Sequence, residues 1–207
     1  PGTVQPPPAA CACTLPTCHC PSRVCTIART GEACSSRMRN ASIGNARNPY
    51  LAWRYRLEPN GDNDTSLSAW MVFALETARD AGLDVGQDCF DGAEAWFRQM
   101  TDPSTGRTGY NLEAGAGSRP SRVAIYSSRF PAEKSESLTA AALLCRMFTA
   151  PRELGSWKEH PDYEILRKQA ELVSRTPPRW DEAGGGIDLY YWYYATFALY
   201  QWGGKAW

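Results

Sequence analysis

The sequence has almost no β-strand signal, little histidine and no net charge. Its 207 residues include 22 basic and 22 acidic side chains. This balance gives no electrostatic reason to expect nucleic acid or an anionic membrane surface as a partner. The two histidines, His19 and His160, do not lie in the Asp/Cys/His spacing that is typical of a zinc site within a helical region.

Long hydrophobic runs are also missing. The most apolar stretch, near the end of the chain, is too short and too rich in tyrosine to span a bilayer. Residues 1–10 lack the basic start and the apolar centre of a signal peptide. We therefore expect no transmembrane segment, while the compartment stays open between the cytoplasm and an exported location.

Cysteine is plentiful but unevenly placed, because six of the eight cysteines lie between Cys11 and Cys34. The candidate metal ligands are Cys11, Cys13, Cys18, His19 and Cys20. Their Cys-x-Cys spacings differ from the Cys-x2-Cys of zinc ribbons, so a disulfide knot, unpaired thiols in a tail or an artefact are alternatives. Cys89 and Cys145 stand alone in apolar helical patterns and are expected to be small buried hydrophobic residues. No cofactor motif is present, and none is expected.

The chain divides into two parts. Residues 1–45 form an irregular, Pro/Cys-rich segment with no helical or strand period, which is a tail, a tether or an artefact of a shifted reading frame. Residues 46–207 carry regular patterning and are assigned to one domain. Apolar residues at helical spacing predict helices over 67–81, 91–101, 137–150, 161–175 and 188–202. Asp64 is a candidate N-cap of the first helix, and Asp88 or Asp91 of the second. The fold class is therefore all-α.

Five consecutive aromatic residues, 190–194, begin the last predicted helix. No part of its helical period is left polar, so this helix must be buried on most sides or line a cavity. The helices over 67–81 and 137–150 are also apolar nearly all round, and they alternate with two helices that have a polar side. An inner and an outer ring of helices would produce this alternation.

Four segments together carry a family resemblance. They are residues 60–75 (Asn-Gly-Asp-Asn-Asp-Thr-Ser-Leu-Ser-Ala-Trp-Met-Val-Phe-Ala-Leu), Phe90-Asp91-Gly92-Ala93, residues 177–181 (Pro-Pro-Arg-Trp-Asp) and the closing aromatic run. The chain resembles the squalene cyclase/prenyltransferase repeat superfamily, and within it the bacterial squalene-cyclase-like proteins of unassigned function. This resemblance implies an α/α toroid of helical hairpins over roughly residues 46–207, which we expect to be incomplete at both ends.

The resemblance also implies where a catalytic acid would stand. Class II terpene cyclases protonate their substrate with the central acid of an Asp-x-Asp-Asp-Thr-Ala motif. Aligning its Asp-Thr pair on Asp64 and Thr65 places Asn63 at the proton donor and Gly61 at the first Asp. An amide cannot supply such a proton. Asp62 and Asp64 are the remaining candidate acids, but Asp62 is out of register and capping is a sufficient role for Asp64.

The aromatic side chains have two interpretations. In cyclases such rings stabilise carbocations, whereas elsewhere they fill cores or bind apolar ligands. The candidate ligand-binding residues are Trp70, Tyr110, Trp180, Asp188, Tyr190, Tyr191, Trp192 and Tyr194. Without an acid nearby, we predict a non-catalytic binding or scaffold module whose partner is an apolar or isoprenoid-like ligand or another protein. The alternative is a terpene cyclase/prenyltransferase-type enzyme acting on polyprenyl or triterpenoid substrates.

Overall fold

The computed structural model describes residues 52–55, 61–111, 130, 135–151, 154–180 and 187–204. Their helices are α2 (Thr65–Asp80), α3 (Gln87–Met100), α5 (Ser137–Thr149), α6 (Tyr163–Ser174) and α7 (Leu189–Trp202), with a 3-10 helix η1 (Trp157–Glu159) before α6. Within these ranges the only extended pairing is an isolated bridge between Thr101 and Thr108. The all-α prediction is confirmed for this part of the chain. The toroid stays a prediction, and residues 1–45 lie outside the described ranges.

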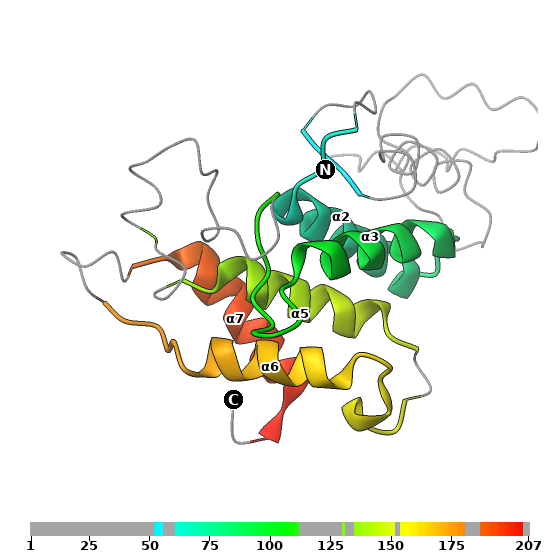
Figure 1. The fold of residues 1–207 in the computed structure, drawn as a ribbon. Coiled ribbons are helices and arrows are strands. Elements are labelled where there is room, and N and C mark those ends of the chain that lie inside the picture. The colour runs from blue at the N-terminus through cyan, green and yellow to red at the C-terminus, as the bar shows by residue number, and fades with distance from the viewer. Residues whose placement is uncertain are drawn as a thin grey trace, which may run out of the picture.

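Helix α5 is the centre of the bundle. Residues 137–147 are all buried, and α2, α3, α6 and α7 each pack against it. Figure 1 shows α5 between the α2–α3 pair and α6. The predicted absence of a polar face explains this burial, and the small side chains of Ala140, Ala141 and Ala142 let neighbouring helices approach closely.

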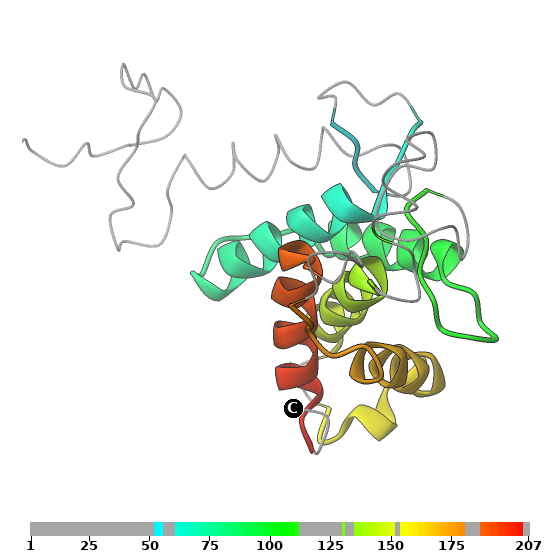
Figure 2. The ribbon, with the colours of Figure 1, turned by 90° about the vertical axis from the view of Figure 1, so that its left-hand side faces the viewer.

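Helix α7 lies along one side of the bundle, where α2 crosses it (Figure 2). Its buried side packs against α5 and α6 and consists of Tyr191, Tyr194, Ala195 and Ala198. Its other side leaves Leu189, Tyr193, Phe197 and Tyr200 exposed. The expected burial on most sides is therefore found for α5 and not for α7, because only one helix can occupy the centre of a bundle this small.

The predicted N-cap of the first helix is confirmed, because Asp64 accepts a hydrogen bond from the Leu67 amide and caps α2. Asp188, which the sequence did not single out as a cap, accepts one from the Tyr191 amide and caps α7. The expectation that Asp88 or Asp91 caps the next helix is wrong, since α3 begins at Gln87 after Gly86 and has no side-chain cap. Asp88 instead lies in the first turn, where its charge favours the positive end of the helix dipole.

A tight turn after α3 leads the chain back across the bundle. The Asp102 carboxylate accepts hydrogen bonds from the Ser104 hydroxyl and amide and from the Thr105 hydroxyl, which lower the pKa of Asp102 to about 2. Gly106 has a φ of +82°, and a Cβ there would lie 2.8 Å from the Cβ of Lys168. Glycine is therefore needed both for the backbone conformation and for the close approach of the turn to α6.

Candidate functional site

The acids suggested by the cyclase resemblance meet at Arg54. Its Nη1 donates to Asp64 Oδ2 at 3.1 Å, and its Nε lies 3.2 Å from Asp62 Oδ2. Asp64 is fully buried, and its Oδ1 also accepts from the Leu67 amide at 2.7 Å and the Ser66 hydroxyl at 2.6 Å. A proton on Oδ1 would point at these donors, so the geometry engages Asp64 as a cap and ion-pair acceptor. Asp62 is exposed, and Asn63 is buried.

A polar seam joins the beginnings of α2, α5 and α7. The Thr65 amide donates to the Tyr110 carbonyl, and the Thr108 amide donates to the Thr139 hydroxyl. Three further contacts complete it: Arg107 with Glu136, Thr139 with Glu136, and Ser135 with Asp188. Asp188, a predicted ligand-binding residue, is thus a buried cap that ties α7 to the start of α5.

Three of the predicted aromatic residues are core residues. Tyr191 and Tyr194 are buried against α5, and the Tyr191 hydroxyl lies 2.7 Å from the Thr176 carbonyl and 3.0 Å from that of Val173. Tyr110 is buried, with the Arg54 guanidinium 5.5 Å from its ring centre. Burial raises the pKa of all three phenols, so they stay neutral at physiological pH. Tyr190 and Trp192 are half-buried at the edge of the core.

The other two predicted aromatic residues are exposed and lie apart. Trp180 is exposed and rests on Trp192, whereas Trp70 is exposed on α2. On α2, Phe73 is a neighbour of Trp70 by helical spacing, and its ring lies 6.4 Å from that of Phe197 on α7. The ring of Phe197 in turn lies 5.1 Å, centre to centre, from that of Tyr193. We call this surface the aromatic face: Trp70, Phe73, Leu189, Tyr193, Phe197 and Tyr200.

The aromatic face contains residues that the sequence pattern did not single out. Leu189, Tyr193, Phe197 and Tyr200 belong to a helix whose every side is apolar, so periodicity cannot tell its buried side from its exposed one. These residues are exposed because α7 packs against α5 with its opposite side.

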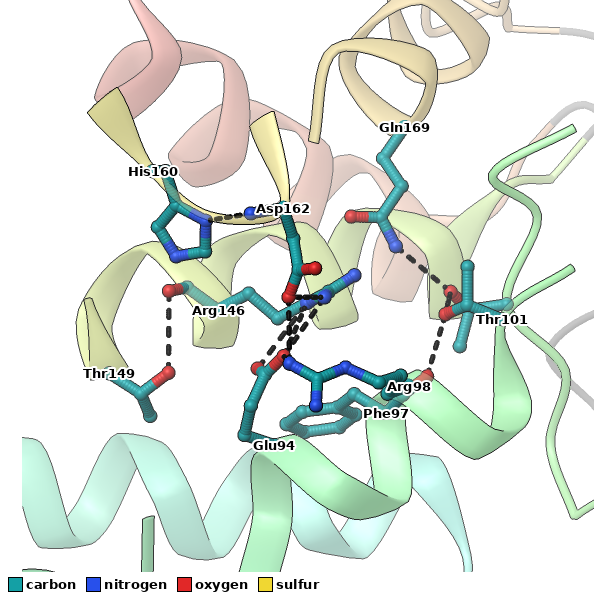
Figure 3. A network of polar contacts seen from close by, with 10 residues as sticks. Glu94, Phe97, Arg98, Thr101, Arg146, Thr149, His160, Asp162 and Gln169 are labelled. Carbon is teal, nitrogen blue, oxygen red and sulfur yellow. Dashed lines mark hydrogen bonds and ion pairs between the residues drawn. The ribbon is translucent and has the colours of Figure 1, made fainter. Parts of the chain in front are cut away.

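A second polar feature, missed entirely from the sequence, is a cluster of charges between α3, α5 and the start of α6 (Figure 3). The Arg146 guanidinium donates to Glu94 Oε1 through Nε at 3.1 Å and through Nη2 at 2.9 Å, and to Asp162 Oδ2 at 2.8 Å. Arg98 donates to the same Asp162 oxygen, also at 2.8 Å. The signal that could have revealed it is the single charge of Arg146 within an otherwise uncharged helix.

The charge cluster borders a cleft of about 170 Å³ that is also lined by Phe90, Thr149 and His160. The His160 Nδ1 accepts a hydrogen bond from the Asp162 amide at 3.0 Å. Burial, together with the positive charges of Arg146 and Arg98, lowers the pKa of His160, while Asp162 opposes this shift. In the neutral form of His160, this hydrogen bond to Nδ1 places the ring proton on Nε2.

The pKa values of the two carboxylates in the cluster are shifted in opposite directions. Burial raises the pKa of Glu94, against the charge and hydrogen bonds of Arg146. For Asp162, burial acts in the same direction but is outweighed by Arg98, Arg146 and His160, so its pKa is lowered. Both carboxylates are engaged by guanidinium groups, so the cluster ties α3, α5 and the start of α6 together.

The other reactive or metal-binding side chains that the sequence suggested are the cysteines and His19. Cys89 and Cys145 are buried as predicted, and burial raises the pKa of the Cys145 thiol. No three His, Cys, Asp or Glu side chains in the described ranges are placed to hold a metal ion. The predicted metal ligands Cys11, Cys13, Cys18, His19 and Cys20 lie outside these ranges. None of the helices described is long and apolar enough to cross a bilayer.

No family model, curated protein or solved structure matches this chain. The resemblance to squalene cyclases therefore stays a prediction from the four sequence segments.

Proposed function

We propose that this chain is a non-catalytic, squalene-cyclase-like helical module that binds or scaffolds, with the helices arranged as part of an α/α toroid. The observation that carries the proposal is the aromatic face, on which Trp70 is 59%, Tyr193 48% and Tyr200 61% exposed. Contiguous exposed aromatic side chains are characteristic of surfaces that bind a partner.

The position of Asp64 argues against the alternative, an enzyme acting on polyprenyl or triterpenoid substrates. A class II cyclase needs a carboxylic acid that can release its proton to an alkene. Here Asn63 stands at that position by alignment, and Asp64 accepts hydrogen bonds from two α2 donors and from Arg54.

The test is incubation of the purified chain with squalene and, separately, with a polyprenyl diphosphate, followed by mass spectrometry of the extracted lipids. We expect no cyclised product. Asp64→Asn serves as the variant, and Asp62→Asn, which changes an exposed acid of the same segment, is its matched control. A cyclised product that is lost in Asp64→Asn and retained in Asp62→Asn would overturn the proposal.

A further inference from the structure

Helix α6 begins without a side-chain cap. Its N-cap residue, Asp162, makes no capping hydrogen bond, and its carboxylate accepts from Arg146 and Arg98 instead. His160 takes over the role that this leaves open. Its ring Nδ1 accepts from the Asp162 amide at 3.0 Å (Figure 3), and its backbone carbonyl accepts from the Tyr163 amide, also at 3.0 Å. One residue thus satisfies two of the N–H groups that start the helix.

The His160 ring can fill this role only while it is neutral. Protonation adds a hydrogen to Nδ1, so the atom that accepted from the Asp162 amide becomes a second donor that faces it. The half-buried Asp162 amide then has no acceptor, at the cost of an unsatisfied N–H group. An imidazolium ion would also stand at the positive end of the α6 dipole, where a cation is unfavourable.

The surroundings of the ring also oppose its protonation. Burial is the largest cause of the lowered pKa of His160, Arg146 and Arg98 add to it, and Asp162 acts in the opposite direction. Helix α7, which η1 reaches through a hydrogen bond from the Trp157 indole, carries no Asp, Glu, Lys, Arg or His. The charged or titratable side chains of the other elements around the ring are Asp91, Glu94 and Arg98 on α3, Arg146 on α5, Lys158 and Glu159 on η1, and Asp162, Tyr163 and Glu164 at the start of α6.

The corner between η1 and α6 is weakly attached to the rest of the bundle. None of the residues from 154 to 165 is buried, whereas residues 137–147 of α5 all are. Besides the charge cluster, two surface contacts hold the corner. The Trp157 indole donates to the Gln201 carbonyl at 3.2 Å, and the Tyr163 ring stacks on that of Trp202. Segments with few buried contacts open at a lower free energy than a core helix does, so loss of the cap acts on this corner first.

We propose that His160 is a pH-sensitive cap of α6, and that its protonation opens the corner between η1 and the first turn of α6 while the other helices stay folded. His160, Pro161 and Asp162 form one wall of the cleft of about 170 Å³. Opening removes this wall and separates the Asp162 carboxylate from Arg146, whose side chain is only 1% exposed in the closed form. The switch uses none of the residues of the aromatic face, so it does not depend on the proposed function.

The experiment is hydrogen–deuterium exchange of the full chain between about pH 7.5 and pH 5.5, on either side of the ordinary histidine pKa of 6.5. Exchange is followed by mass spectrometry and corrected for the intrinsic rate at each pH. Below pH 6.5 the open form binds one more proton than the closed form, so opening of residues 160–166 should rise by up to about tenfold per pH unit. The amides of α5 are the internal reference and should show no such rise.

Two variants separate His160 from the other titratable groups. His160→Gln keeps an oxygen that can accept from the Asp162 amide but cannot titrate, so its corner should stay closed over the whole range. His19→Gln removes the other histidine of the chain and is the matched control, which should behave like the parent. Circular dichroism at each pH confirms that the variants are folded.

Three outcomes would overturn the switch. The first is a parent in which opening of residues 160–166 does not change with pH. The second is a rise in opening that His160→Gln shows to the same extent. The third is an equal loss of protection in α5, which would mean that acid unfolds the whole bundle and not its corner.

Discussion

Replacing Arg146 with methionine tests whether the charge cluster clamps the bundle. The Arg146 side chain is 1% exposed, while its partners Glu94 and Asp162 are 21% and 26% exposed. Methionine keeps most of the volume but leaves two carboxylates beside a buried apolar side chain. Loss of one partner from a buried ion pair costs about 3–5 kcal/mol, and partial access of water to the carboxylates favours the lower end.

The same cluster supplies a matched control. Arg98 donates to Asp162 Oδ2 at the same distance of 2.8 Å as Arg146 but is 63% exposed. An exposed ion pair contributes about 0–1 kcal/mol, so Arg98→Met is expected to cost no more than that. Because of burial, the loss in free energy of unfolding should be roughly 2 kcal/mol or more larger for Arg146→Met than for Arg98→Met, although both arginines share one acceptor oxygen.

The assay is urea unfolding followed by circular dichroism for the parent and both variants. We expect Arg146→Met to lower the free energy of unfolding by about 3 kcal/mol at neutral pH. Its deficit should shrink as the pH falls, because protonation removes the carboxylate charges that Arg146 no longer neutralises. Glu94 should be protonated first, since burial raises its pKa above the ordinary value of 4.5. Equal losses in the two variants, or a deficit that grows in acid, would refute the reasoning.

Two further predictions concern His160 and Gly106. Because the folded-state pKa of His160 lies below its ordinary value of 6.5, the unfolded chain binds the extra proton first. The free energy of unfolding should therefore fall as the pH drops from 6.5 toward the folded-state pKa. In His160→Gln, the free energy of unfolding should depend less on pH over the same range. Calorimetric scans that give the parent and the variant the same pH dependence would contradict this. Gly106→Ala should lower the free energy of unfolding in urea by about 2 kcal/mol, because its φ is positive and the added Cβ would clash with α6. Gly82→Ala is the control: its φ is +79° but the space around it is open, so it should cost only about 1 kcal/mol. Equal losses would show that the turn does not approach α6 tightly.

Much of the fold could be predicted from local sequence features. Helical periodicity located all five described α-helices, and the position of Asp64 located one of their caps. These features depend on residues within one or two turns of each other, which a single sequence displays directly. The start of α3 was misplaced because its first turn has no capping side chain, so the acidic residues nearby were the stronger signal.

The candidate sites depended on contacts between distant segments. Glu94, Arg146 and Asp162 come from three elements, and nothing in their spacing along the chain indicates that they meet. The aromatic residues divided into core and surface for a similar reason, since Tyr191 and Tyr193 are almost adjacent but only Tyr191 is buried.

The sequence by itself determined that the chain is helical and that its last helix is apolar on every side. The tertiary structure decided that α5 and not α7 takes the centre of the described helices, that Arg146 is buried between two carboxylates and that Tyr193, Phe197 and Tyr200 are exposed. The physical reason is that periodicity records the shape of one helix, whereas burial and ion pairing arise only when several helices compete for the same interior.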